Sequence, residues 1–189
     1  MANFIALYDS CVLYPAPLRD LLMHLTLTDL YRAKWTNDIH DEWILNVLLN
    51  RPDLKKSQLE RTRELMNSNV RDCLVEGYKK LIPALKLPDP NDRHILAAAI
   101  HSSTSVIVTY NLKDFPSKII NEFGIEAQHP DDFLSRLIDL SSDIVCRAIR
   151  RLRLGLKNPP KNTGEYLDIL KKQSLLKTAS KLEKFITLI

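Results

Sequence analysis

The segments "LPDPNDRHILAAAI" (87–100) and "SVIVTYN" (105–111) determine the expected fold class. Asp89 and Pro90 are favoured at the N-cap and first position of an α-helix, and Asp92 stands where a carboxylate complements the helix dipole. The second segment is filled with β-branched residues and bounded by polar ones, which predicts a buried strand. A helix leading into a buried strand is the repeating unit of an α/β protein.

The flanking sequence continues this alternation. Residues 4–8, "FIALY", predict a buried strand, and "FGIEAQHPDDFLSRL" (123–137) predicts a short strand and then a helix that begins near Pro130 and Asp131. Apolar residues recur at helical spacing after Pro15 and Pro17 and after "NDIHDE" (37–42), which predicts two amphipathic helices. A further helix is expected around residues 57–66. Residues 70–87 favour neither type. The order predicts a parallel sheet flanked by helices.

Composition narrows the class of protein. The 189 residues are 45% hydrophobic and 26% charged, enough for one core and a small appendage. The three cysteines, Cys11, Cys73 and Cys146, are far apart, so neither a disulfide framework nor a zinc site is indicated. No charged leader precedes the first apolar run and no segment approaches the roughly 20 apolar residues of a membrane span, so we expect a cytoplasmic protein without a membrane partner.

Charge is distributed unevenly along the chain. Residues 1–146 hold 16 Lys and Arg against 20 Asp and Glu, whereas residues 147–189 hold 11 against 3. The segment "RAIRRLRLGLK" (147–157) therefore predicts a cationic helix that could follow a phosphate backbone or meet an acidic partner. A solvated helix face without a ligand stays an alternative. The candidate phosphate contacts in this segment are Arg147, Arg150, Arg151 and Arg153.

Several acidic side chains are expected at one edge of the sheet. Groups at the carboxyl ends of parallel strands converge at a topological switch point, which would place Asp9 beside Asn111 and Asp114. Asp92 and Glu42, each in the first turns of a helix, could project into the same crevice. Each also has an ordinary explanation: Asp92 as a helix-terminus residue, Glu42 as a surface carboxylate and Asp114 as a turn residue.

Asp9 is the hardest of these acids to explain by structure alone. A charged group at the end of a core strand is costly unless it is paired, and the first basic residue after it is Arg19. A hard divalent cation such as Mg²⁺ or Mn²⁺ would resolve the cost, because it prefers carboxylate oxygens. A cluster without histidine or cysteine ligands argues against zinc.

The sequence resembles the PIN-domain nucleases, in particular the VapC-type toxins of bacterial toxin–antitoxin pairs. The resemblance covers roughly residues 3–137 and rests on four segments, "YDSCVLYP" (8–15), "DIHDEWI" (38–44), "DPNDRHILAAAI" (89–100) and "VIVTYNLKDFP" (106–116). It implies an α/β, three-layer fold with a central parallel sheet for residues 1–140. Residues 141–189 resemble the helical C-terminal extension of a PIN subfamily.

The resemblance also implies a site and a reaction. Asp9, Glu42 and Asp92 match the first three family acids, and Asp114 is assigned the fourth place, where Asn111 is the alternative because it stands where many relatives have aspartate. These acids would hold Mg²⁺ or Mn²⁺ in a ribonuclease that hydrolyses RNA phosphodiester bonds. The expected role is the toxin of a type II pair, with RNA as substrate, an antitoxin as partner and a homodimer as the assembly.

Other residues are assigned supporting roles. Ser10, Thr109 and Asn111 are candidate donors that orient the carboxylates, and Arg93 and His94 are candidates for RNA contact or for ordinary helix-surface positions. A haloacid-dehalogenase-like phosphatase is disfavoured because Cys11 occupies the place of its second aspartate. A nucleotide-binding loop is disfavoured because the four glycines form no phosphate-cradling array. The main rival is a non-catalytic PIN module that binds RNA or protein.

Overall fold

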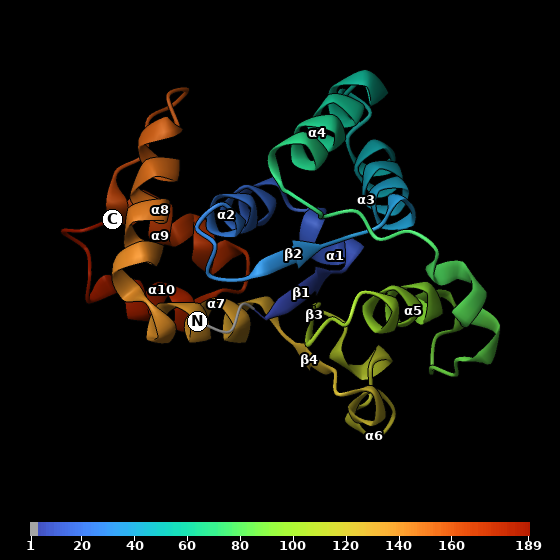
Figure 1. Cartoon of the computed structure of the whole chain (residues 1–189). Helices are drawn as coiled ribbons and strands as arrows, with labels where there is room; N and C mark the ends of the chain where they lie inside the picture. Colours follow the sequence, from blue (N-terminus) through green and yellow to red (C-terminus); the bar gives the residue numbers. More distant parts are fainter. Residues whose placement is uncertain (1–3) are drawn as a thin grey trace. The chain divides into compact units, whose positions relative to one another are not determined.

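The computed structural model describes residues 4–189, which form two compact units (Figure 1). Unit 1 comprises the segment ending at Tyr14 together with Tyr31–Gln128, and unit 2 comprises Pro15–Leu30 together with His129–Ile189. The domain boundary predicted between residues 140 and 141 does not coincide with the division into these two units. As a boundary between functional domains it stays a prediction.

Unit 1 is built on a four-stranded sheet in which every neighbouring pair is parallel. The strands are β1 (Ile5–Tyr8), β2 (Arg32–Lys34), β3 (Val106–Val108) and β4 (Glu126–Gln128), in the order β2-β1-β3-β4. The predicted α/β class with a central parallel sheet is confirmed. Strand β2 was not predicted, because "RAK" is short, has a basic residue at each end and lacks the apolar run typical of a buried strand.

Helices flank the sheet of unit 1. Helices α3 and α4 lie together near β2, and α5 and α6 lie near β3 and β4 (Figure 1). The α-helices of unit 1 are α1 (Ser10–Leu13), α3 (Asn37–Asn50), α4 (Lys56–Asn69), α5 (Arg93–His101) and α6 (Ser117–Ile120). Its 3₁₀-helices are Tyr78–Ala84, Pro90–Asp92, Leu112–Asp114 and Asn121–Phe123.

The central strands explain why helices are needed beside them. Leu7, Tyr8, Ile107 and Val108 are fully buried, so both faces of β1 and β3 must be shielded from water. Helix α5 contributes three consecutive buried alanines, residues 97–99, to the core of unit 1. Burial of this apolar surface is the main source of stability for the sheet.

The helix start predicted at residues 89–92 is correct in its cap but not in its first turn. The Asp89 side chain accepts a hydrogen bond from the Asn91 amide at 2.8 Å, as an N-cap does. The turn that follows is a 3₁₀-helix, so α5 begins only at Arg93. Asp92 therefore stands at the junction of the two helices.

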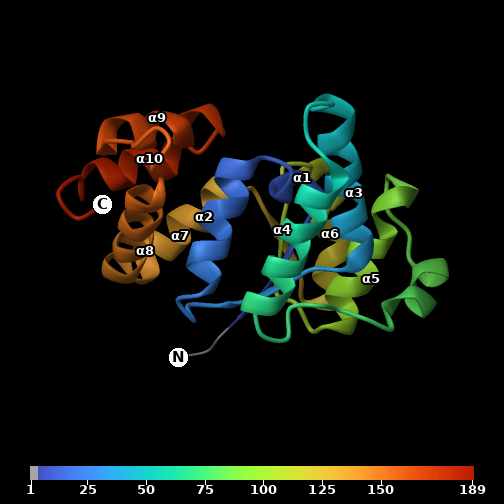
Figure 2. The ribbon, with the colours of Figure 1, turned by 90° about the horizontal axis from the view of Figure 1, so that it is seen from above.

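All the regular secondary structure among the described residues of unit 2 is α-helical. It contains α2 (Ala16–Thr26), α7 (Pro130–Leu140), α8 (Ser142–Gly155), α9 (Thr163–Lys172) and α10 (Leu176–Glu183). Helix α2 packs on α8 and α9, while α7 packs on α8 and α10 (Figure 2). The predicted helical C-terminal region is thus confirmed, and it includes a helix from the beginning of the chain.

Apolar residues recur every four positions at Ile144, Ala148, Leu152 and Leu156, which predicts the buried face of α8. In the structure Ala148 and Leu152 are buried, but Ile144 and Leu156 are only half-buried. Val145, Cys146 and Ile149 complete the apolar face. The strict four-residue spacing of the prediction drifts around a helix with 3.6 residues per turn, which explains the difference.

Among residues 4–189, no helix has the length and apolar character needed to cross a bilayer.

Candidate active site

The acids predicted to form the site all belong to unit 1 and stand at the carboxyl edge of its sheet. Asp9 directly follows β1, and Asp114 ends the 3₁₀-helix Leu112–Asp114 that follows β3. Strands β1 and β3 are neighbours, while the chain places β2 on the other side of β1. The site therefore lies at a topological switch point, where parallel sheets commonly bind ligands.

Asp9 is buried and its carboxylate is held by neutral donors. Its side chain is 3% exposed. Oδ2 accepts hydrogen bonds from Thr109 Oγ1 at 2.6 Å and from Cys11 Sγ at 3.0 Å, and Oδ1 accepts one from Ser10 Oγ at 3.3 Å. These bonds fix the orientation of a charged group that would otherwise be costly at this depth.

One of the three donors to Asp9 was not predicted from the sequence. The contacts of Ser10 and Thr109 with Asp9 were anticipated, but Cys11 was missed as a third donor. Cys11 also accepts a hydrogen bond from the Tyr110 amide at 3.3 Å. Burial, together with the Asp9 charge, raises the pKa of the Cys11 thiol, so it stays a protonated donor. Its position two residues after a strand-ending aspartate is the sequence signal that could have identified it.

The surroundings of Asp92 disfavour the ionised form of its carboxyl group. Burial raises the pKa of its carboxyl to about 6, and the charges of Asp9, Asp89 and Asp114 act in the same direction. These interactions place Asp92 within electrostatic range of the acids on both neighbouring strands. The site consequently concentrates negative charge, which favours the binding of a cation or of protons.

Glu42 joins the site through a histidine. Glu42 Oε1 lies 2.8 Å from His94 Nε2, with the two side chains 40% and 12% exposed respectively. Burial opposes a charge on His94, but the hydrogen bond and charge of Glu42, with Asp38 and Asp9 adding to them, raise its pKa overall. His94 therefore faces Glu42 from the start of α5, and this contact was not predicted.

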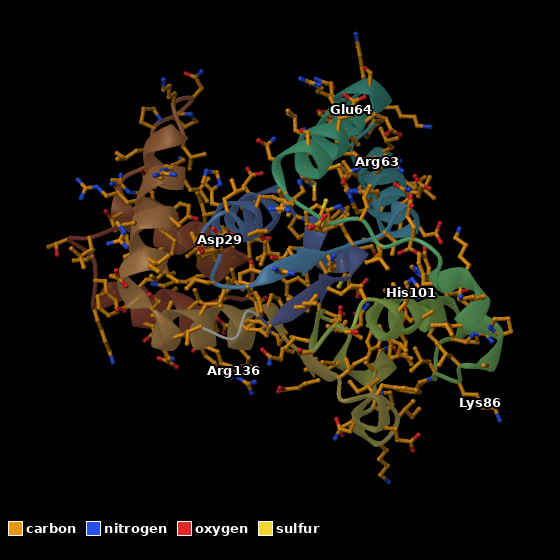
Figure 3. All side chains as sticks on the ribbon, in the orientation of Figure 1. Asp29, Arg63, Glu64, Lys86, His101 and Arg136 are labelled. Carbon is orange, nitrogen blue, oxygen red and sulfur yellow. The ribbon has the colours of Figure 1, made fainter. Side chains whose placement is uncertain are left out.

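The N-terminal part of α3, which carries Glu42, is fixed by several contacts. The Thr36 side chain caps the helix by accepting from the Ile39 amide at 3.1 Å. Arg63 reaches from α4 towards α3 (Figure 3) and donates to Asp41 Oδ1 at 2.9 Å and to Asn37 Oδ1 at 2.6 Å. Glu42 is thus presented by a braced helix rather than by a loop.

The remaining residues of the prediction lie near the site or in unit 2. The Asn111 amide donates to Thr109 Oγ1 at 2.9 Å, so its backbone supports the residue that holds Asp9, while the residue as a whole is exposed. Arg93 is half-buried and donates from Nε to the Pro90 carbonyl at 2.9 Å. Neither contact decides between Asn111 and Asp114 as the fourth site residue, which stays a prediction.

The four arginines of α8 are not equivalent. Arg150 and Arg151 are exposed, and Arg147 is exposed and pairs with Asp143 at 2.9 Å. Arg153 instead donates to the carbonyls of Lys161 at 2.8 Å and Ile189 at 3.3 Å. The three-residue spacing of Arg150 and Arg153 predicts that both lie on one exposed helix face. This prediction is wrong for Arg153, which is half-buried and whose guanidinium links α8 to two other segments of the chain.

The four acidic side chains of the site are chemically suited to bind a hard cation, although they are not arranged as a complete coordination sphere. Asp9, Glu42, Asp92 and Asp114 offer carboxylate oxygens only, the ligands that Mg²⁺ and Mn²⁺ prefer. Within residues 4–189, no three His, Cys, Asp or Glu side chains are arranged as ligands of a single ion. The raised pKa of Asp92 nevertheless indicates charge repulsion that a cation would relieve. The residues therefore fit such an ion by chemistry and charge.

Two family models match this chain. A family model described as a PIN domain matches residues 6–113, the part of the chain that contains Asp9, Glu42 and Asp92. The chain belongs to the PIN-domain family. A second model, described as the VapC50 C-terminal domain, matches residues 130–184, which lie within unit 2.

One curated relative of this PIN-domain protein comes from Mycobacterium tuberculosis (strain ATCC 25618 / H37Rv) and is described as "Putative ribonuclease VapC50". The two are 39% identical over 97 residues, which cover 51% of this chain and 57% of the relative. The match thus spans little more than half of the length of that relative. No solved structure matches the chain.

Proposed function

We propose that this PIN-domain protein is a metal-dependent endoribonuclease and the toxin of a type II toxin–antitoxin pair, acting in the cytoplasm on RNA. The main support is the electrostatic cluster in which Asp9, Asp89 and Asp114 contribute to the raised pKa of Asp92. A cluster of this kind at a switch point is poorly explained by stability, because like charges repel. The family and the VapC50 relative support the choice of RNA as substrate and of an antitoxin as partner.

We assign the residues of the site two roles, metal binding and positioning of the attacking water. Asp9, fixed by Thr109, Cys11 and Ser10, would provide the rigid metal ligand, and Asp92 and Asp114 would complete the ligand set. Glu42, oriented by His94, would bind metal or position the attacking water. Mg²⁺ or Mn²⁺, when bound, supplies charge neutralisation at the phosphate and lowers the pKa of a bound water.

The hydrolytic step needs no covalent nucleophile from the protein. Cys11 is excluded from that role, because burial and the Asp9 charge raise the pKa of its thiol. The protein's own contribution would be to hold the carboxylates in place. Asp92 would be available as a ligand only above its raised pKa of about 6.

Cleavage of a single-stranded RNA by EDTA-treated protein tests the proposal. Activity is expected only after Mg²⁺ or Mn²⁺ is restored, and Asp9→Asn and Asp92→Asn should each reduce it at least about 100-fold. Asp53→Asn, an exposed residue that pairs with Arg51, is the control and should keep full activity. RNA that binds without being cut under every metal condition would favour a non-catalytic PIN module instead.

The fourth site residue and the assembly need separate measurements. If Asp114 is a ligand, Asp114→Asn should weaken Mn²⁺ binding about 10-fold or more, while Asn111→Ala should have a small effect. The reverse ranking would assign the place to Asn111. The expected homodimer is tested by light scattering of the purified protein.

A further inference from the structure

Unit 2 contains a pocket of about 350 Å³ that is separate from the acidic site. Its walls come from the start of α2, the end of α8, the loop after it and α9. Small-molecule sites commonly have volumes of roughly 300–1,000 Å³. The walls are mainly apolar and include Pro17, Leu152, Leu156, Pro159 and Ile169.

A tyrosine without a hydrogen-bond partner lines this pocket. Tyr166 is 3% exposed, and its hydroxyl is buried without a partner. An unsatisfied buried hydroxyl costs on the order of 1–3 kcal/mol, so its presence in a lining residue points to a ligand. Burial and the charge of Asp20 raise the pKa of this hydroxyl, which keeps it a donor and places it within electrostatic range of Asp20.

The polar groups around the tyrosine define what the pocket could recognise. Asp20 offers a carboxylate at the exposed edge, and Lys157 and Lys161 line the same pocket. Among residues 4–189, neither lysine forms an ion pair. A ligand matched to these groups has a flat apolar body, adjacent N–H donors for the carboxylate, an acceptor for the hydroxyl and an anionic group for the lysines.

Guanine in a nucleotide meets all of these requirements. Its Watson–Crick edge carries two adjacent donors, N1–H and N2–H₂, which match the two oxygens of one carboxylate, with O6 beside them as an acceptor. The other standard bases place an acceptor next to each donor and would leave a carboxylate oxygen facing a lone pair. Protein recognition of single-stranded RNA commonly reads these edges of unstacked bases.

We propose that this pocket binds a guanine base of single-stranded RNA, with Asp20 accepting from N1 and N2 and the Tyr166 hydroxyl donating to O6. Lys157 and Lys161, which line the same pocket, would contact the phosphate of that nucleotide. The inference rests on the proposed ribonuclease function in one respect, namely that the guanine belongs to RNA. It adds a second RNA contact, in unit 2, to the acidic site of unit 1.

Titration of the whole chain with mononucleotides in the presence of EDTA tests the pocket without involving catalysis. We expect 5′-GMP to bind with a Kd below about 1 mM and at least about 10-fold more tightly than AMP, CMP and UMP. Tyr166→Phe and Asp20→Asn should each weaken GMP binding about 10-fold. Tyr166→Phe removes only an oxygen that has no partner in the structure, so its melting temperature should not fall.

Asp168→Asn is the matched control, because Asp168 is an exposed carboxylate on α9 that does not line the pocket. It should leave GMP binding unchanged. Equal affinity for all four nucleotides, no binding at millimolar concentration, or unaltered binding in both pocket variants would overturn the inference. Binding of GMP by a chain that cleaves no RNA would keep the inference and reject the proposed function, so the two can fail separately.

Discussion

Asp9 and Asp92 differ in what surrounds their carboxylates: hydrogen-bond donors surround Asp9, whereas acidic residues lie near Asp92. Asp9 is almost completely buried, but three neutral donors compensate for its lost hydration. Asp92 is less buried, yet its partial burial, together with the charges of neighbouring acids, raises its pKa to about 6. The first arrangement provides a fixed ligand, and the second keeps stored repulsion that a cation can release.

Asp92→Asn should stabilise the metal-free protein in a pH-dependent manner. Because the folded-state pKa is raised, the folded protein binds more protons than the unfolded chain between pH about 4 and 6, and its stability falls as pH rises through that window. The variant should therefore match the parent near pH 4 and exceed it at pH 7.5 by about 1 to 2 kcal/mol, after allowance for solvent screening.

Urea denaturation in EDTA at the two pH values measures this difference. Glu122→Gln, an exposed residue of unit 1, changes the net charge equally and should give no gain. A loss of stability in Asp92→Asn at pH 7.5 would contradict the repulsive cluster. The same titration predicts that cleavage increases as pH rises through about 6, because Asp92 must lose its proton before it can bind a metal.

Thr109 should be needed for both stability and metal binding. It is fully buried and its hydroxyl donates to Asp9 at 2.6 Å, so Thr109→Val leaves a buried carboxylate short of one donor. We expect a loss of about 1.5 to 3 kcal/mol in the free energy of unfolding and a 10- to 100-fold loss of Mn²⁺ affinity.

Thr109→Ser separates the hydroxyl from the shape of the side chain. It keeps the donor and removes one methyl group, so the expected cost is about 1 kcal/mol with Mn²⁺ affinity preserved. Isothermal titration with Mn²⁺ provides the comparison. If the serine variant loses as much affinity as the valine variant, packing rather than the hydrogen bond orients Asp9.

At the scale of elements, α7 and α10 are joined by a buried carboxylate. Asp131, 5% exposed in the first turn of α7, accepts from the amides of Lys177 at 2.9 Å and Thr178 at 2.8 Å, in the first turn of α10. Helix α10 is preceded by Leu175, which provides no side-chain cap. Asp131 supplies the missing acceptors from another helix and places its charge at the favourable end of the helix dipole.

Asp131→Ala should destabilise unit 2 by about 2 to 4 kcal/mol, because two amides at a helix start lose a charged acceptor. The adjacent Asp132→Ala is the control. Asp132 forms an exposed ion pair with Lys177 Nζ at 2.5 Å, and such surface pairs contribute about 0 to 1 kcal/mol. Thermal unfolding followed by circular dichroism should rank the two variants in this order, and equal effects would show that the amides find other acceptors.

The sequence predicted most elements because their signals are local. Helices α2 and α3 followed from apolar spacing, and α7 from Pro130 at its first turn. A helix within α4 was also predicted. Strand β2 was missed because its position depends on pairing with β1 rather than on its own composition. The link between Glu42 and His94 was missed for a related reason, since it joins α3 and α5, which are far apart in the sequence.

At the scale of the whole molecule, the chain does not divide at a single point. Helix α2 lies between β1 and β2 in the sequence but packs on α8 and α9 in unit 2. Sequence composition cannot show that α2 packs with the C-terminal helices, because its apolar face is equally suited to covering a sheet or joining a helical bundle. The position of Asp9 and Asp114 at one edge of the sheet, in contrast, could be predicted, because strand ends of a parallel sheet converge whatever packs around them.

The charge asymmetry of the chain leads to the last prediction. Residues 147–189 carry 11 basic against 3 acidic residues, but Lys171, Lys177 and Lys181 pair with acids and Arg153 is bound to backbone carbonyls. Arg150 and Arg151 are exposed and, among the described residues, form no ion pair. They are therefore the α8 arginines best suited to bind phosphates.

Arg150→Ala combined with Arg151→Ala should weaken RNA binding and reduce the slope of log affinity against log salt concentration by about 1 to 2, because each lost phosphate contact releases fewer counterions. Cleavage at saturating RNA should change little, since both residues belong to unit 2 and the acids to unit 1. Arg153→Ala should behave differently, lowering the melting temperature while leaving the slope nearly unchanged. Fluorescence anisotropy at several salt concentrations distinguishes the variants, and a double variant whose slope equals that of the parent would mean that α8 presents a solvated face and that RNA binding does not use its charge.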